Sequence, residues 1–413
     1  MSQTAMRARA ISTRIFLSFA GAYFVSYALR SVNAALAPLL AADLQLSAGR
    51  LGWLTSAFFL AFASMQIPLG IALDKFGARR AESTLLLVGA CGALIVSLGS
   101  SLWTLSAGRL LIGIGVSGCL MAPYSYFRRC FPTERQSQLA LWMLISGTLG
   151  ALAATQPTLA LAHWIGWRGV FATAAALLTL GSAAIFSLTG DQDRHSAPVP
   201  EGAAPAGFLS LIGHPTMLRV IPTSIFFSGG LTALQTLWTG PWLTQVLGLT
   251  TMEAGDALLA FNTALLASYI AMSLFSTRLE RLGLPLARQS LLGFVWVVSC
   301  LCLIVFWRTR DAWILWLLLA PGIPAVVLMQ TQTATAFPRH LAGRILTTFN
   351  LVTFSGAFIV QWGIGLAVDL FISFGNPRDA ALTRAFLCLA ALQAASLLWF
   401  VLRRPALPSV RVN

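Results

Sequence analysis

Charged side chains are scarce in this sequence, and acidic ones most of all. Asp and Glu number 13 against 27 Lys and Arg, and all charged residues make up 10% of the chain. Soluble domains carry about a quarter. Hydrophobic residues make up 57%, and apolar stretches of about 20 residues, the length that crosses a bilayer as a helix, recur along the chain. The composition therefore excludes an ordinary soluble domain.

Motifs that would indicate catalysis or a metal are also missing. The four histidines and six cysteines show no metal-ligand or disulfide spacing, and no phosphate-cradling glycine-rich loop occurs. The sequence therefore predicts no enzyme, no cofactor, no metal site and no use of ATP by this chain. A net charge of +14 does not indicate nucleic acid here, because the basic residues lie in short segments between apolar stretches.

Hydropathy predicts an all-α membrane protein with twelve transmembrane helices. The expected helices cover residues 15–41, 49–72, 84–101, 104–127, 137–162, 168–189, 218–246, 254–276, 289–307, 312–337, 345–371 and 381–403. A polar stretch with several prolines, 190–216, divides them into two six-helix halves and is typical of a linker. The expected domains are therefore an N-terminal half over 1–189 and a C-terminal half over 217–413.

Most basic residues fall on the side of the membrane that holds the two termini. The positive-inside rule then predicts that both termini and the linker are cytoplasmic. Basic residues are nearly all arginine, with Lys75 the single lysine, which is typical of a GC-rich bacterial genome. We therefore expect a multi-pass protein of a bacterial inner membrane.

The segment after the second expected helix carries a spaced motif that runs glycine, three residues, aspartate, a base, one residue, glycine, one residue and two bases. The matching positions are Gly70, Asp74, Lys75, Gly77, Arg79 and Arg80. Ser276, Glu280, Arg281 and Gly283 repeat part of it at a constant offset. Two related halves around a central substrate site are typical of transporters. An ordinary positive-inside loop is the alternative.

This motif resembles the loop 2–3 signature of the major facilitator superfamily. The resemblance implies two six-helix halves that alternate access to a central site, with this loop as a gate brace. Arg109, with Gly113 and Gly115 after it, resembles a second signature of the superfamily. That resemblance implies a role in proton movement or conformational coupling, and a structural arginine is the alternative. Asp369 could carry a proton, although a solvated or paired carboxylate fits its position equally.

Arg30 lies near the middle of the first apolar stretch, which holds no acidic residue. A guanidinium at membrane depth costs at least a few kcal/mol and cannot lose its proton. Tyr23, Tyr27, Arg30 and Asn33 form one polar stripe at helical spacing. The arrangement resembles the first helix of organophosphate antiporters and anion/cation symporters of the superfamily, which implies that Arg30 binds a phosphate or carboxylate.

The position equivalent to Arg30 in the second half is Thr236, so no second arginine faces it there. This favours a carboxylate over a sugar phosphate. Alternatively, protein groups neutralise Arg30 and it binds no substrate. Weaker candidates at membrane depth, each more often an interhelical hydrogen bond, are Gln235, Trp238, Asn262, Gln330, Asn350 and Gln361.

The sequence predicts a secondary transporter of a small organic anion, and the resemblance to the superfamily implies uptake with a proton as the coupling ion and a monomer as the working unit. An exporter of a metabolite or drug is the first alternative. The fifth expected helix lacks the Gly-Pro-x-x-Gly-Gly element of many drug antiporters, which counts against that alternative. A non-transporting membrane receptor or assembly factor is the alternative from another class.

Overall fold

The computed structural model describes residues 3–131, 133–189, 211–337 and 342–403, and all the regular elements among these residues are helices. The all-α expectation is therefore confirmed. Nine helices among the described residues are long and apolar enough to cross a membrane, and two shorter apolar helices accompany them. The expected number of twelve stays a prediction. Most of the expected linker, 190–210, lies outside the described residues.

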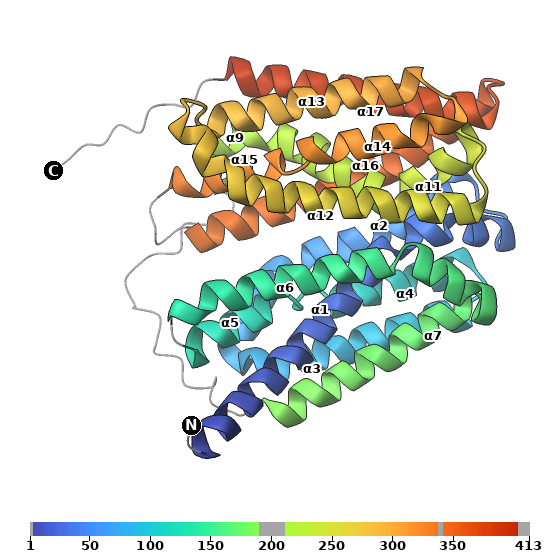
Figure 1. The fold of residues 1–413 in the computed structure, drawn as a ribbon. Coiled ribbons are helices and arrows are strands. Elements are labelled where there is room, and N and C mark those ends of the chain that lie inside the picture. Colours follow the sequence, from blue (N-terminus) through green and yellow to red (C-terminus); the bar gives the residue numbers. More distant parts are fainter. Residues whose placement is uncertain (1–2, 132, 190–210, 338–341, 404–413) are drawn as a thin grey trace.

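The helices of the first half are α1 (Gln3–Asp43), α2 (Ala48–Ser64), α3 (Gln66–Leu98), α4 (Leu102–Gly115), α5 (Met121–Cys130), α6 (Thr133–Ala153) and α7 (Gln156–Leu188). Figure 1 shows them, in blue to green, packed together beneath the helices that follow. The expected second span corresponds to α2 and the start of α3, which are separated by a short break at Met65.

The second half begins with one helical run from Pro215 to Val246 that alternates α and π turns. Its parts are α9 (Pro215–Thr223), η2 (Ser224–Gly229), α10 (Gly230–Ala233), η3 (Leu234–Trp238), α11 (Thr239–Pro241) and η4 (Trp242–Val246). The remaining elements are α12 (Thr251–Arg281), α13 (Leu286–Phe306), η5 (Arg310–Trp313), α14 (Ile314–Leu319), η6 (Ala320–Gly322), α15 (Ala325–Thr335), α16 (Ala342–Ser373) and α17 (Arg378–Leu402).

The spaced glycine motif forms a much tighter turn than the sequence suggests. Gly70 to Arg80 all lie within α3, and only Gly77 leaves helical geometry, with φ at +76°. Gly283, its counterpart in the second half, also has a positive φ of 88°. Glycine adopts this conformation without the steric cost of a Cβ atom. The same backbone feature therefore turns the chain at equivalent places in the two halves.

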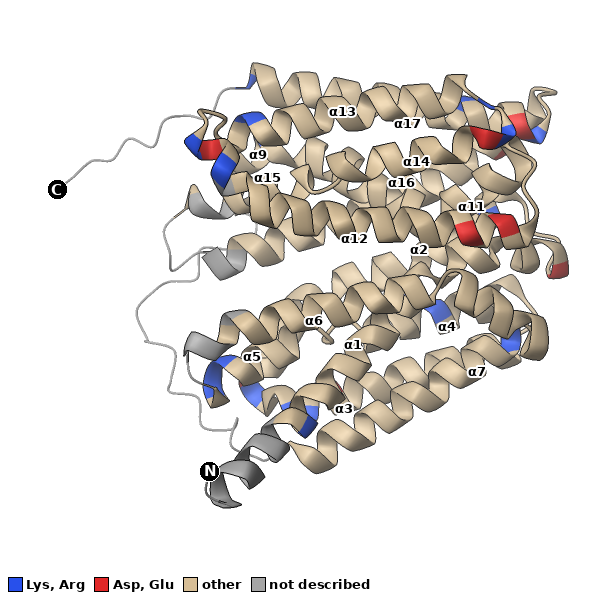
Figure 2. Cartoon of the chain, in the orientation of Figure 1, with Lys and Arg blue, Asp and Glu red and all other residues tan. Residues whose placement is uncertain are grey.

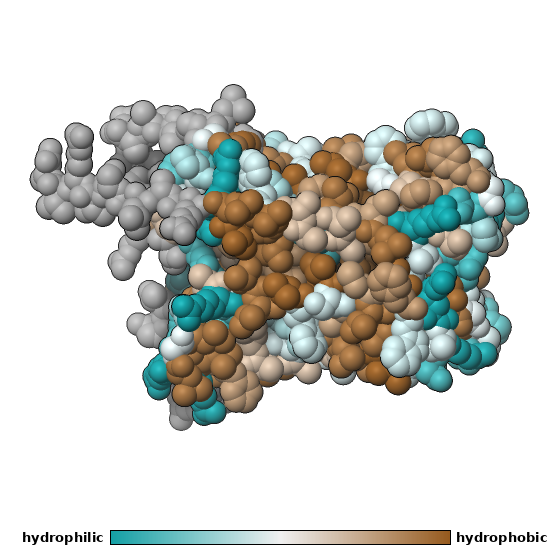
Figure 3. All heavy atoms as spheres, turned by 90° about the horizontal axis from the view of Figure 1, so that it is seen from above, coloured by the Kyte–Doolittle hydropathy of each residue, from teal (hydrophilic) through white to brown (hydrophobic). Residues whose placement is uncertain are grey.

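Apolar residues cover the outside of the bundle, and charges collect at its two ends. Figure 2 shows Lys, Arg, Asp and Glu near the helix ends, with long uncharged stretches between. One face, in Figure 3, is hydrophobic across its middle and more hydrophilic toward both ends. Exposed Leu180, Leu274 and Leu398 belong to this outer surface. Such a surface suits a hydrocarbon environment, as expected for a multi-pass membrane protein.

The bundle has two distinct ends. The described chain begins in α1 and finishes in α17 at the same end, which we name the terminal end (Figure 1). The opposite end, where α1 finishes and α2 begins, is named the far end. The turn at Gly77 lies at the terminal end, and the contact between Ser47 and Asp369 lies at the far end.

Candidate functional site

Arg30 lies where the two halves meet, among aromatic rings from both. Its guanidinium carbon is 4.5 Å from the centre of the Tyr27 ring and 5.0 Å from that of Phe62. It also lies 5.1 Å from the ring of Phe354, which α16 contributes from the second half. Phe62 and Phe354 touch each other, with ring centres 4.5 Å apart. The cation is therefore bounded by the faces of three rings.

These rings do not satisfy the hydrogen-bonding groups of Arg30. Its Nε is buried without a partner, and no carboxylate among the described residues lies within salt-bridge distance of it. A cation–π contact contributes about 0.5 to 2 kcal/mol, whereas a charge at bilayer depth costs more. The site thus retains an unsatisfied positive charge with planar hydrogen-bond donors, which matches the geometry of a carboxylate or phosphate.

Tyrosine is concentrated around this arginine. The buried Tyr23 stacks edge-on against Tyr27 with ring centres 5.1 Å apart. Tyr124 of α5 and Tyr269 of α12 both interact electrostatically with Tyr27. Tyr23 and Tyr27 therefore lie beside the cation, and Tyr124 and Tyr269 lie near Tyr27. Their hydroxyl groups can donate or accept hydrogen bonds, so they suit the polar edges of a small solute.

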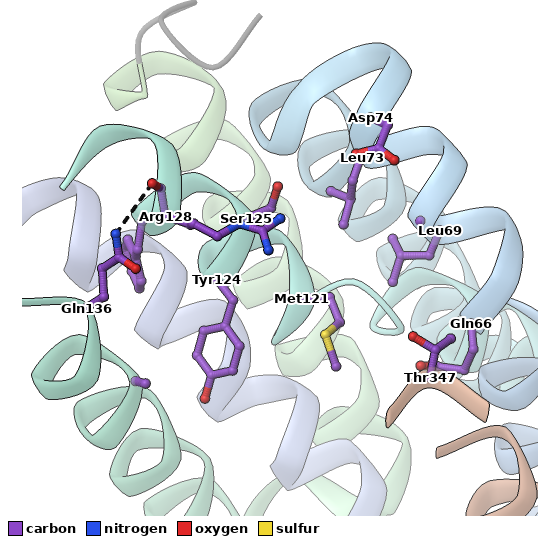
Figure 4. A pocket seen from close by; sticks show the side chains of 13 residues that line it. Gln66, Leu69, Leu73, Asp74, Met121, Tyr124, Ser125, Arg128, Gln136 and Thr347 are labelled. Carbon is purple, nitrogen blue, oxygen red and sulfur yellow. Dashed lines mark hydrogen bonds between the residues drawn. The ribbon is translucent and has the colours of Figure 1, made fainter. Parts of the chain in front are cut away.

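A cavity opens at the terminal end. It holds about 510 Å³, within the range of small-molecule sites. Figure 4 shows Gln66, Leu69 and Asp74 of α3 facing Met121 and Arg128 of α5 across it. Tyr124 also lines this cavity, and its hydroxyl points away from Asp74 toward the interior (Figure 4). Since Tyr124 also interacts with Tyr27, it connects the cavity to the surroundings of Arg30.

The far end is closed by a contact between α2 and α16. Asp369 of α16 accepts hydrogen bonds from the Ser47 hydroxyl at 2.7 Å and from the backbone N–H groups of Ala48 at 3.0 Å and Gly49 at 2.9 Å. A carboxylate at a helix N-terminus satisfies free N–H groups and interacts favourably with the helix dipole. Asp369 of the second half therefore caps a helix of the first.

Gln361 forms a second connection near the far end. Its side-chain Nε2 donates to Thr55 Oγ1 at 2.8 Å, and its Oε1 accepts from Thr236 Oγ1 at 3.0 Å. Its backbone carbonyl accepts from the Trp238 indole at 2.9 Å. All these groups are buried. Gln361 and Trp238 thus have protein partners in this conformation, and Gln361 links the halves through Thr55.

Four other candidate residues pair with each other in the second half. Gln235 Nε2 donates to Asn262 Oδ1 at 2.9 Å, and Asn262 donates in turn to the carbonyl of Leu258. Gln330 Nε2 donates to Asn350 Oδ1 at 3.3 Å. Asn33 is buried on α1, one turn beyond Arg30. A substrate contact by any of these residues stays a prediction.

The motif at the terminal end makes contacts within the first half. Arg129 Nη2 of α5 lies 3.5 Å from Asp74 Oδ1, and Arg79 Nε donates to the Phe186 carbonyl of α7 at 2.7 Å. Lys75 lies over the ring of Phe76. Gly70 and Arg80 are exposed. The proposed gating role of this motif stays a prediction.

Arg109 is buried in α4. Its Nη1 donates to the Leu29 carbonyl of α1 at 3.3 Å, while Nε and Nη2 have no partner. Phe58 and Phe171 present their rings to it. The bond to a backbone carbonyl agrees with a structural role, and the contact beside Arg30 also allows conformational coupling, so both alternatives stay open.

Phe62, Phe354 and Tyr124 were not anticipated as site residues. Nothing in their sequence neighbourhood distinguishes them from core aromatic residues, since each contacts the site through packing between separate helices.

Comparison with models of protein families assigns this sequence to a known family. The model of the Major Facilitator Superfamily matches residues 19–361, which is most of the chain. The chain belongs to the Major Facilitator Superfamily. The match includes Arg30, the turn at Gly77 and Gln361.

Relatives in this superfamily have varied named substrates. The chain is 26% identical over 176 residues to the "Probable sulfoacetate transporter SauU" of Cupriavidus necator, covering 42% of this chain and 41% of that relative. It is 35% identical over 99 residues to the glucose transporter GlcP of Staphylococcus epidermidis, covering 24% and 22%. The chain thus matches less than half the length of these curated relatives.

Solved structures of low sequence identity share the fold along nearly the whole chain. The POT family transporter PepTSo has a TM-score of 0.79 at 14% identity, covering 96% of this chain and 97% of that one. A bacterial homologue of the lysosomal transporter Spinster, in an inward-facing and occupied conformation, has a TM-score of 0.74 at 16% identity, covering 95% and 96%. These relatives and structures are named as transporters rather than enzymes, and the likeness of the structures concerns the fold.

Proposed function

We propose that this protein is a secondary transporter that takes up a small organic anion, a carboxylate, by alternating access with a proton as the coupling ion. The observation that carries the proposal is the guanidinium of Arg30. It lies between the halves, has no carboxylate partner in the described part of the chain, and carries a buried Nε without a partner, with three aromatic rings around it. An anion would supply the missing charge and acceptors.

The arrangement of the two ends supports alternating access. The far end is closed by Asp369 and Gln361, while a cavity opens at the terminal end. We place the terminal end in the cytoplasm of a bacterium, on the strength of the positive-inside rule. The conformation is then inward-facing, with the halves 1–189 and 217–413 rocking about the central site and a monomer as the working unit.

The second half supports a singly anchored anion. Thr236, at the position equivalent to Arg30, already bonds to Gln361, and no second arginine accompanies it. One guanidinium can bind one carboxylate in a bidentate manner. The name of the relative SauU suggests sulfoacetate as a first probe, since that compound carries a carboxylate and a sulfonate.

Uptake into proteoliposomes tests the proposal. Radiolabelled sulfoacetate, acetate and lactate are supplied under an imposed pH gradient, with glucose as the neutral comparator. Because a hydrogen bond to a charged group contributes about 1.5 to 3 kcal/mol, Arg30→Gln should reduce anion uptake roughly tenfold to a hundredfold. Arg308→Gln, which alters an exposed arginine, is the matched control and should transport normally.

Two outcomes would contradict the anion proposal. Full anion uptake by Arg30→Gln would remove Arg30 from the site. Uptake of glucose alone by the unmodified protein would show a neutral substrate. An exporter remains the competing direction, and it would show itself as accumulation of the probe in inverted vesicles and as raised tolerance of expressing cells to their cargo.

A further inference from the structure

The first half contains a carboxyl group that the site described above does not use. Glu82 lies in α3, between the turn at Gly77 and the middle of the bundle. Its side chain is fully buried, and it is the only acidic residue among the buried side chains of the described residues. Neither carboxyl oxygen has a nitrogen or oxygen hydrogen-bond partner, and the weakly donating thiol of Cys119 is the group beside it.

Glu82 lies beside a short series of polar groups that leads toward Arg30. The thiol of Cys119, in the turn between α4 and α5, is next to the carboxyl group, and Ser26 of α1 is next to that thiol. A Cβ atom at Gly118 would collide with Glu82 Oε2, so the backbone approaches the carboxyl group closely. Ser26 precedes Arg30 by about one helical turn.

Charged groups on the helices packed against α3 are engaged elsewhere or distant. Arg109 of α4 donates to Leu29, Arg129 of α5 pairs with Asp74, and Arg79 donates to Phe186. Arg128 of α5 lines the cavity at the terminal end. The remaining charged or titratable side chains of α2, α7 and α16 with described positions lie toward the far end: Arg50, His163, Arg168 and Asp369. Cys119 is thus the titratable group that acts on Glu82.

We propose that Glu82 carries the coupling proton. An ionised carboxylate, buried with no cation and only a weakly donating thiol beside it, costs several kcal/mol. The neutral acid avoids this cost, so Glu82 holds a proton in the conformation described here. The proposal rests on proton-coupled transport as proposed above, and it assigns the coupling residue.

A route for this proton leads to the cavity at the terminal end. Leu69 lines that cavity, and it also approaches Gly118 next to the Glu82 carboxyl group. We take the side chain of Leu69 as the layer that separates Glu82 from the cavity. When this layer opens, the O–H bond of the acid breaks and the proton passes to a water molecule. The product is a hydronium ion and a carboxylate, and the reverse step reloads the acid.

Electrostatics can connect this proton to the substrate. Arg30 acts electrostatically on Cys119, and Cys119 in turn acts on Glu82. A positive potential favours the ionised carboxylate. An anion bound to Arg30 would cancel that potential and favour the protonated acid. Binding of the anion would then strengthen binding of the proton, and the proton would strengthen binding of the anion, as symport requires.

Infrared spectroscopy tests the protonation of Glu82 without a substrate. At neutral pH the purified protein should show the carbonyl band of a protonated carboxylic acid that shifts in deuterated water. Glu82→Gln should abolish that band, and Glu280→Gln, at an exposed position, should keep it. A band that persists in Glu82→Gln, or a wild-type protein without one, would overturn the proposal.

Transport measurements test the coupling role. With sulfoacetate as the probe, Glu82→Gln should keep exchange of labelled for unlabelled sulfoacetate, which moves no net proton. Its accumulation driven by a pH gradient should fall roughly tenfold or more. Equal loss of exchange and accumulation, or full accumulation, would contradict a coupling role. If the wild-type protein transports none of the anions, the proposed function fails, whereas the infrared band still decides whether Glu82 holds a proton.

Discussion

The two ends of the bundle are formed by different kinds of residue. At the far end, helices from both halves meet backbone to backbone. Cβ atoms at Gly52 and Gly365 would press against Gln361 and Ala48, and Gly240 lies directly against the carbonyl of Ala34. At the terminal end, a cavity of about 510 Å³ separates side chains such as Asp74 and Arg128. Small residues close one end, and long polar residues border the other.

This difference shows how a membrane transporter can close tightly and still open. Contacts between small residues give close packing without long side chains that must be disentangled. The cap by Asp369 and the bonds of Gln361 are each worth about 0.5 to 2 kcal/mol. Their sum remains within the few kcal/mol by which a ligand can shift two conformations.

The most severe test of the far-end contact is Gly365→Leu. A Cβ atom at this position would lie 2.5 Å from the Ala48 carbonyl oxygen, and overpacking of this kind costs about 1 to 3 kcal/mol. We expect the far end to open. Spin labels at positions 45 and 376, in a cysteine-free background, should report longer distances. Gly363→Leu is the control, because nothing lies near its Cβ position, and longer distances there would contradict the packing argument.

We expect Asp369→Asn to open the far end less than Gly365→Leu does. The amide oxygen still accepts hydrogen bonds from α2, but the charge that favours the helix N-terminus is lost, at a cost of about 0.3 to 1 kcal/mol. The same spin labels should show a modest gain of the open population. Asp379→Asn, at an exposed position of α17, should leave the distances unchanged. No shift with Asp369→Asn would show that the cap needs no charge.

The smallest effect on stability should come from substitutions at the terminal end. In the pair between Asp74 and Arg129, the side chain of Asp74 is 72% exposed, and exposed pairs contribute about 0 to 1 kcal/mol. Asp74→Asn should leave the thermal unfolding temperature in detergent nearly unchanged, as should Arg80→Gln. A fall in unfolding temperature as large as that of Gly365→Leu in the same assay would mean that the two ends are equally important for this conformation.

Much of the fold could be predicted from sequence, because membrane helices follow from local hydropathy. The turn at Gly77 and its repeat at Gly283 were visible as a motif, and both glycines have positive φ. Arg30 was visible because a charge in an apolar stretch stands out. These features depend on residues that are neighbours in sequence.

Contacts between distant segments could not be predicted in this way. Phe354 meets Arg30 across the two halves, and Asp369 caps a helix that begins at Ala48. Glu82 was overlooked for another reason. The third helix was expected to begin at residue 84, which left Glu82 in a loop, whereas α3 continues through it. A boundary shifted by a few residues changed a buried acid into an apparently solvated one.

The π turns between Ser224 and Val246 have a mechanical consequence. A π turn holds one residue more than an α turn, so converting one to the other advances the following side chains by about 100° around the axis. Gln235, Thr236 and Trp238 all lie in η3. A local rewinding there would change which of them faces Gln361, and the part of the helix that follows would turn with it. A partial rotation of this helix about its axis can therefore exchange one set of hydrogen-bond partners for another.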